Sequence, residues 1–202
     1  MRILITGGTG QLGRDLHTAL ASHGVVSLSH ADLDVSNAAA ADAAFKEHRP
    51  EAVVHCAALT DTARCECEPE AAEAVNAAGT EHVAAAAAAI GATLFVISTN
   101  EVFDGAKGAP YVETDAARAV NAYGASKLEG ERRAALVNPD ARIVRTSWLY
   151  GDGGNNFVEK VLVAARAGRT LSFVSDEVAA PTSTFDLAEA LQAMIERNAP
   201  PG

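Results

Sequence analysis

Arg2-Ile-Leu-Ile-Thr-Gly-Gly-Thr-Gly-Gln-Leu-Gly13 is the stretch that decides the fold, because it joins a short apolar run to spaced glycines. Residues 2–6 predict a buried strand, and residues 11–22, with leucines at helical spacing, predict a helix. Glycines between a strand and a helix are typical of a turn that receives a dinucleotide pyrophosphate, although an ordinary glycine turn is the alternative. The residues of the turn predicted to bind this group are Gly7, Thr9, Gly10, Gln11, Leu12 and Gly13.

The rest of the chain alternates strand-like and helix-like segments. Strands are expected at 2–6, 25–29, 52–58, 93–99, 141–147 and 171–174, and helices at 11–22, 37–48, 69–90, 122–137, 157–167 and 185–197. Strict alternation predicts a doubly wound parallel sheet of the Rossmann type, a three-layer α/β/α fold in which ligands bind beyond the carboxyl ends of the strands.

Composition narrows the functional classes. The 202 residues carry a net charge of −10, which argues against a general surface for nucleic acid or anionic membrane. The sequence shows no leader segment and no apolar run of membrane-spanning length, so we expect a cytoplasmic location. The three cysteines do not predict a disulfide framework, and no convincing metal site is visible.

The ends of the second and third expected strands supply further candidates for cofactor binding. An acidic residue that binds the adenosine ribose normally ends the second strand, but here Ser29 and His30 stand there. A missing carboxylate removes repulsion against a 2′-phosphate, which favours NADP(H), with NAD(H) as the alternative. Asp34 either accepts a hydrogen bond from adenine or caps the next helix. The predicted cofactor site also includes Val35 and, at the end of the third strand, Cys56, Ala57 and Ala58.

Tyr123 and Lys127 lie four residues apart, on one face of the expected helix 122–137. A free phenol has a pKa of about 10, so acid–base work near neutrality needs about 4 kcal/mol of stabilisation. An ammonium about 4 Å away supplies roughly that amount at an effective dielectric constant of about 20. We therefore predict that Tyr123 is a catalytic acid tuned by Lys127, which also binds ribose, and that Thr99 hydrogen-bonds a substrate carbonyl. A chance Tyr–Lys pair on a solvated face is the alternative.

These residues resemble the extended short-chain dehydrogenase/reductases and, within them, the dTDP-4-dehydrorhamnose reductase family. The resemblance spans nearly the whole chain and lies in Thr6–Gly13, Ser98–Gly105, Asn121–Lys127, Arg145–Gly151, Asn155–Phe157 and Asp176–Thr182. It implies reduction of the 4-keto group of a dTDP-deoxysugar by NAD(P)H, converting dTDP-4-dehydrorhamnose to dTDP-rhamnose. Tyr123 would protonate the oxygen. Substrate contacts would come from Thr99, Asn100, Trp148 and Asn156.

The chain also departs from the family pattern. Asn100-Glu101 replaces the usual Asp-Tyr, and the chain stops where the family continues into a sugar-binding lobe. We therefore expect an NAD(P)-binding domain at 1–150 and a partial substrate-binding segment at 151–202, a reduced or truncated lobe. Another epimerase or carbonyl reductase of the superfamily, or a non-catalytic NADP-binding regulatory subunit, is the alternative. Arg145 binds either phosphate or an internal carboxylate, and helices 69–90 and 122–137 are candidates for a homodimer interface.

Overall fold

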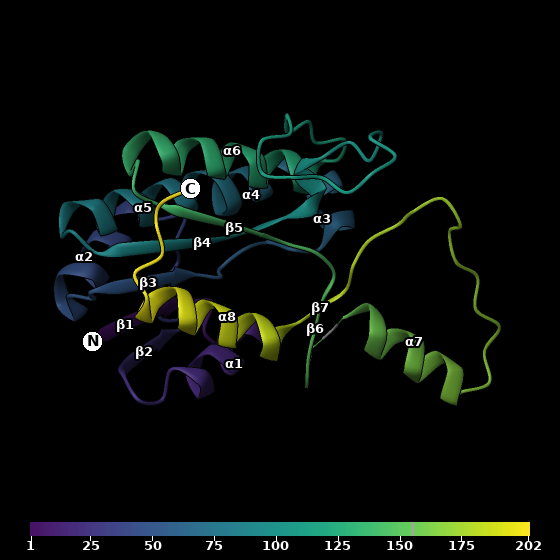
Figure 1. Ribbon diagram of the computed structural model, residues 1–202, viewed down its shortest axis with the longest axis horizontal. Helices are drawn as coiled ribbons and strands as arrows, with labels where there is room; N and C mark the ends of the chain where they lie inside the picture. Colours follow the sequence, from purple (N-terminus) through teal and green to yellow (C-terminus); the bar gives the residue numbers. More distant parts are fainter. Residues whose placement is uncertain (155) are drawn as a thin grey trace.

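The computed structural model describes residues 1–154 and 156–202; Asn155 of the Asn155–Phe157 motif lies outside them. Five parallel strands form the central sheet in the order β2-β1-β3-β4-β5 (Figure 1). Their bounds are β1 Arg2–Thr6, β2 Gly24–Leu28, β3 Ala52–His55, β4 Thr93–Thr99 and β5 Arg142–Thr146. The chain reverses its direction across the sheet between β1 and β3, and this switch point is where open α/β sheets bind ligands.

Helices cover both faces of the sheet, which confirms the doubly wound, three-layer prediction (Figure 1). Helices α1 (Gln11–Ala19) and α8 (Thr184–Glu196) cover one face, where leucines such as Leu16 and Leu191 pack on the isoleucines of β1. Helices α2 (Ala38–His48), α5 (Gly79–Ala89) and α6 (Ala122–Val137) cover the other. Helix α8 packs in the same hydrophobic cluster as α1, so the two helices form one layer on this face of the sheet. The domain boundary at residue 150 stays a prediction.

Side-chain caps fix where the helices begin. Asn37 accepts a hydrogen bond from the backbone N–H of Ala40 at the start of α2, and Asn121 accepts one from Gly124 at the start of α6. The expected helix 69–90 is interrupted by a π-helical segment: α4 (Pro69–Ala72) leads into Glu73–Ala78, which continues into α5. The π segment carries the buried Asn76 towards α6, where its carbonyl would lie 2.3 Å from any Cβ at Gly130.

Several local features differ from the sequence predictions. Residues 171–174 form no strand, and Phe173 is exposed and lies edge-on to Phe157. The sequence reading missed helix α3 (Thr62–Cys67) and the short parallel pair β6 (Leu149–Tyr150) and β7 (Thr182–Ser183). The third strand ends at residue 55, not 58. Helix α7 (Phe157–Arg166), as expected, is helical, although none of its described side chains is buried.

Candidate active site

The glycine turn between β1 and α1 packs too closely for side chains. Gly7 has a φ of 68°, and a Cβ there would lie 2.7 Å from the backbone nitrogen of Ala57. A Cβ at Gly13 would lie 2.6 Å from the carbonyl oxygen of Gly7. The N-cap, Gly10, brings no side chain to the first turn of α1, so the N–H groups of that turn stay available to an anion. Leu12 contributes only its backbone, because its side chain is buried in the core.

The end of β2 carries a carboxylate that the sequence reading missed. The Ser29 hydroxyl donates to Asp32 at 2.6 Å, and the Ser29 N–H donates to the same oxygen at 2.9 Å. These bonds hold the pKa of Asp32 below its usual range. The sequence prediction that this strand end lacks a carboxylate is therefore wrong. The Asp32 carboxylate, three residues further along the chain, lies at Ser29.

The other cofactor-binding candidates near β2 lie in three different environments. Asp34 accepts hydrogen bonds from the N–H and hydroxyl of Ser36, so it closes a turn, and Asn37 is the residue that caps α2. His30 is exposed. Val35 buries its side chain in the hydrophobic cluster with Phe45, so only its backbone could face a ligand.

A buried hydrogen-bond chain runs beneath the end of β3. The Thr80 hydroxyl donates to the carbonyl of Asn76 at 2.6 Å, so its oxygen accepts from Nε2 of His55 at 3.1 Å. The Nδ1 atom of His55 then accepts from the Thr6 hydroxyl at 2.7 Å. Asn76 in turn donates to Ser126 on α6 at 3.0 Å. The chain thus connects the glycine turn to the helix that carries Tyr123.

Two of the three residues after His55 pack against the glycine turn. The backbones of Ala57 and Cys56 lie against Gly7, and Ala58, which follows them, is half-buried. Burial raises the pKa of the Cys56 thiol to about 12, so this sulfur stays protonated and unreactive at neutral pH.

The structure brings Thr99, Tyr123 and Lys127 together at the end of β4. Thr99 is 6% exposed. Burial, with a smaller contribution from the charge of Glu101, raises the pKa of Tyr123 to about 12, against the lowering effect of a hydrogen bond with Thr99. The Nζ atom of Lys127, which is 4% exposed, donates to the carbonyl of Ile97 at 2.8 Å.

Burial opposes the tuning of Tyr123 by Lys127 that the sequence predicts, and this role of Lys127 stays a prediction. The charge of Glu101 acts on the phenol in the same direction as burial. Burial also lowers the pKa of Lys127 to about 8, against the opposing charge of Glu131. The protein alone therefore holds a protonated phenol, because removing it from water outweighs any attraction from the ammonium.

The remaining sequence candidates surround this centre. Arg145 forms an internal ion pair: it donates twice to Glu131, at 3.0 Å and 2.6 Å, which decides between its two predicted roles. Asn100 accepts from the Thr99 hydroxyl at 3.5 Å. Asn156 donates to Gln11 at 3.0 Å, so it ties the start of α7 to the glycine turn. Trp148, with a φ of 45°, packs against Phe157 with ring centroids 5.0 Å apart.

Two hydroxyls at the end of β5 extend the candidate site. Thr146 lies beside Thr99 in the sheet register, and Ser147 follows it. Their hydroxyl oxygens are buried and find no hydrogen-bond partner in the part of the chain that the structure describes. Buried polar atoms normally have partners, so these two are suited to bind a ligand. The signal in the sequence was the Arg145–Gly151 motif, in which only Arg145 and Trp148 were candidates for ligand binding.

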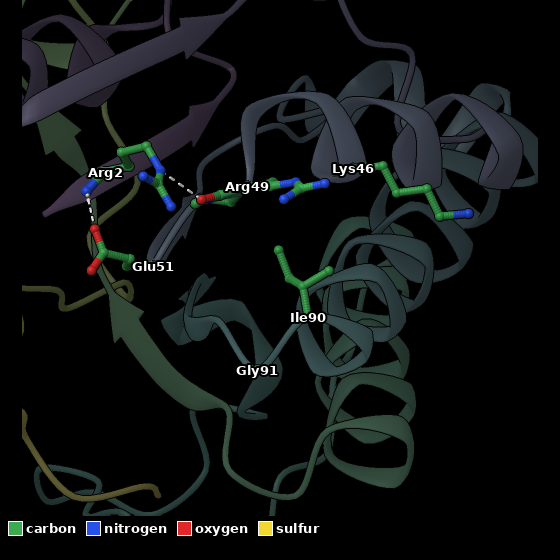
Figure 2. Close-up of a pocket in the computed structure, with 7 residues that line it drawn as sticks. Arg2, Lys46, Arg49, Glu51, Ile90 and Gly91 are labelled. Atoms are coloured by element: carbon green, nitrogen blue, oxygen red, sulfur yellow. Dashed lines mark hydrogen bonds between the residues drawn. The ribbon is translucent and has the colours of Figure 1, made fainter.

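A cavity lies away from this site. It has a volume of about 450 Å³ and is lined by Arg2, Lys46, Arg49, Pro50, Glu51, Ile90 and Gly91 (Figure 2). These residues are at the amino ends of β1 and β3, opposite the glycine turn. Arg2 is already engaged there, since its Nε donates to the carbonyl of Arg49 at 2.9 Å and its N–H to Glu51 at 2.7 Å (Figure 2). We do not assign a ligand to this cavity.

Residues 1–154 and 156–202 contain no group of three or more His, Cys, Asp or Glu side chains that could hold a metal ion. They also contain no helix with the length and apolar composition needed to cross a bilayer.

Known proteins with a similar sequence and fold place the chain in context. The family model described as RmlD substrate binding domain matches residues 1–201. A curated dTDP-4-dehydrorhamnose reductase from Streptomyces griseus is 44% identical over 196 residues, which cover 96% of this chain and 64% of that protein. A crystal structure of a dTDP-4-dehydrorhamnose reductase from Clostridium acetobutylicum ATCC 824 has a TM-score of 0.94 and 42% identity, covering 98% of this chain and 71% of that chain.

A second solved structure is that of the dTDP-4-dehydrorhamnose reductase from Bacillus anthracis str. Ames in complex with NADP. It has a TM-score of 0.92 and 36% identity, covering 96% of this chain and 70% of that chain. The chain thus spans 64% of the length of the Streptomyces griseus protein and 71% and 70% of the two crystallised ones.

Proposed function

Because the chain belongs to the RmlD substrate binding domain family, we propose that it is an NAD(P)H-dependent reductase of a dTDP-sugar. The proposed reaction converts the 4-keto group of dTDP-4-dehydrorhamnose to the alcohol of dTDP-rhamnose, the activity named for its relatives. The observation that carries the proposal is that Thr99, Tyr123 and Lys127 lie together at the carboxyl end of the sheet, where the glycine turn also lies.

The residues fit a nicotinamide dinucleotide. The bare backbone at Gly7 and Gly13 and the open first turn of α1 suit a pyrophosphate, because a Cβ at either glycine would collide with backbone atoms. Ser29 and Asp32 would hold the adenosine ribose, and Lys127 the ribose of the nicotinamide. When bound, the reduced nicotinamide supplies the hydride. The proposal includes NADP(H) as the cofactor, with NAD(H) as the alternative, and is supported by the NADP complex of a relative.

The side chains of this protein would manage the proton and the keto oxygen. Thr99 would donate a hydrogen bond to that oxygen and orient it towards Tyr123. Since burial keeps the phenol protonated, Tyr123 is able to give its proton to the oxygen as negative charge develops there. The ion pair of Arg145 with Glu131, which also accepts from Ser98, would fix the end of β4 beneath Thr99. The partially exposed Trp148 would lie along the sugar.

Replacing Asp32 with Asn should increase the preference for NADPH over NADH. The carboxylate lies on Ser29, where it would repel a 2′-phosphate and accept a hydrogen bond from a 2′-hydroxyl. We expect the ratio of the dissociation constants, NADH over NADPH, to rise by roughly tenfold, because the substitution removes the charge that would repel a 2′-phosphate. Asp42→Asn, on the outer part of α2, is the matched control. An unchanged ratio would mean that Asp32 does not face the ribose.

The proposed function is tested by mixing the protein with NADPH and dTDP-4-dehydrorhamnose and following the loss of reduced cofactor together with formation of dTDP-rhamnose. Sugar-dependent oxidation is the expected result. Binding of NADPH without oxidation would contradict the proposal and favour a nucleotide-binding regulatory subunit. Oxidation with a different carbonyl compound only would favour another reductase of the superfamily.

A homodimer through α5 and α6 stays a prediction. In the structure these helices pack on each other within one chain, with Arg133 of α6 bound to Glu73 and Glu81. Sedimentation velocity on the wild-type protein and on an Arg132→Glu variant of the exposed side of α6 measures the oligomeric state.

A further inference from the structure

The first turn of α6 is held by side chains from two other elements. Asn121 caps the helix through the N–H of Gly124 at 2.7 Å. Glu66 of α3 accepts a hydrogen bond from the N–H of Ala122 at 2.6 Å. Glu101, in the 3₁₀ turn Asn100–Val102 after β4, accepts one from the side-chain nitrogen of Asn121 at 2.7 Å. Tyr123 lies inside this turn, so the three contacts fix the backbone that carries its ring.

Glu101 is also fixed at its own backbone. Its N–H donates to the Thr99 hydroxyl oxygen at 3.2 Å, which ties it to the residue that faces the phenol. Its carbonyl is in such close contact with α6 that a Cβ at Gly124 would lie 2.1 Å from the oxygen. The turn after β4 and the start of α6 therefore form one unit, in which Glu101 touches Thr99 on one side and the cap of the Tyr123 helix on the other.

We propose that Glu101 is a positioning residue for the acid of the proposed reaction: through Asn121 and Thr99 it fixes the geometry between the Tyr123 phenol and the end of β4. This inference deepens the proposed function and rests on it. It also gives a structural reason for the Asn100-Glu101 pair, since the Glu101 carboxylate is occupied by the helix cap and is not directed to a second acid–base step.

The charge of Glu101 adds an electrostatic consequence to the geometry. The groups that act on the pKa of the phenol are Thr99 at the end of β4, Cys65 on α3 and Glu101 itself. Lys127 lies one turn along α6, and Glu66 accepts a hydrogen bond from the N–H of Ala122. Of these, Glu101 is the carboxylate that raises the pKa of Tyr123. A negative charge disfavours a second one on the phenolate, so Glu101 helps to keep the proton on the ring.

The test uses two substitutions at one position and one control, with readouts that need neither substrate nor cofactor. Glu101→Gln keeps an oxygen for Asn121 but removes the charge, whereas Glu101→Ala removes both. Glu66→Gln, at the other carboxylate of the helix start, is the matched control. Amide hydrogen exchange of Gly124 reports the cap, and ¹³C NMR of ring-labelled tyrosine reports titration. The protein has three tyrosines, and Tyr123→Phe assigns the relevant signal.

We expect exchange at Gly124 to be roughly tenfold faster in Glu101→Ala, the loss associated with a charged hydrogen bond. In Glu101→Gln that rate should stay near the wild-type value, while the titration midpoint of Tyr123 falls by roughly 0.5 to 1 unit. Glu66→Gln should leave the midpoint unchanged. Wild-type exchange in Glu101→Ala, or a wild-type midpoint in Glu101→Gln, would overturn the proposal. Because no turnover is measured, failure of the proposed reaction would be seen separately.

Discussion

Replacing Tyr123 with Phe is expected to lower the kcat of keto reduction by about 10²- to 10⁴-fold, the usual contribution of a general acid. The substitution removes one oxygen from a half-buried ring, so the fold and the cofactor turn should be preserved. The measurement is steady-state kcat, together with the dissociation constant of NADPH from quenching of protein fluorescence, which should change by less than about threefold.

Tyr111→Phe is the matched control for this prediction. The Tyr111 hydroxyl donates to Asp104 at 2.8 Å in the loop after β4, outside the set of Thr99, Tyr123 and Lys127. Its loss should leave kcat within about twofold, since hydrogen bonds of this kind contribute about 1 kcal/mol to stability. Equal loss of activity in the two variants would show that Tyr123 is not the specific proton donor.

The second large effect is a loss of stability in acid that depends on His55. This side chain is 0% exposed, and burial, with a smaller effect from the Lys127 charge, lowers its pKa to about 3 from 6.5. A depressed histidine pKa favours the neutral folded form. The contribution is therefore fully present above pH 6.5 and is lost as the pH falls towards 3. The loss approaches about 1.4 kcal/mol per pH unit, or about 5 kcal/mol over the whole range.

The free energy of unfolding in urea at pH 7, 6, 5 and 4.5 tests this prediction. Carboxylates with lowered pKa values, such as Asp104 and Asp115, also lose stability in acid, so variants must be compared with the wild type. His55→Gln should be less stable at pH 7 yet lose less stability on acidification. His30→Gln, at an exposed position, should follow the wild-type curve. Parallel curves for His55→Gln and wild type would contradict the role of His55.

The sequence predicted the layered sheet well because its signals are local and repeated. Apolar runs such as 93–99 must be buried on both faces, and the glycine spacing demands a tight turn between β1 and α1. The run 171–174 shows the limit of such signals. Four apolar residues are compatible with a strand, but they form one only where a neighbouring strand hydrogen-bonds to them. A short segment does not reveal whether such a partner is present.

The sequence predicted which residues form the candidate site better than it predicted the contacts between them. The order of the motifs was enough to bring Thr99, Tyr123 and Lys127 together. The bonds that set their chemistry involve partners far apart in the chain, such as Lys127 with Ile97 and Asn121 with Glu101. Burial is likewise a property of the packed molecule. It reverses the expected direction of the Tyr123 pKa, and spacing along a helix cannot reveal it.

Deuterium transfer tests the central claim most directly. The protein is incubated with NADPH that carries deuterium at C4 of the nicotinamide and with dTDP-4-dehydrorhamnose, and the product is analysed by NMR. A reductase built on Thr99, Tyr123 and Lys127 predicts one deuterium at C4 of the sugar when one of the two C4 epimers of labelled NADPH is used. Product without deuterium from either epimer, or no product although NADPH binds, would contradict the claim.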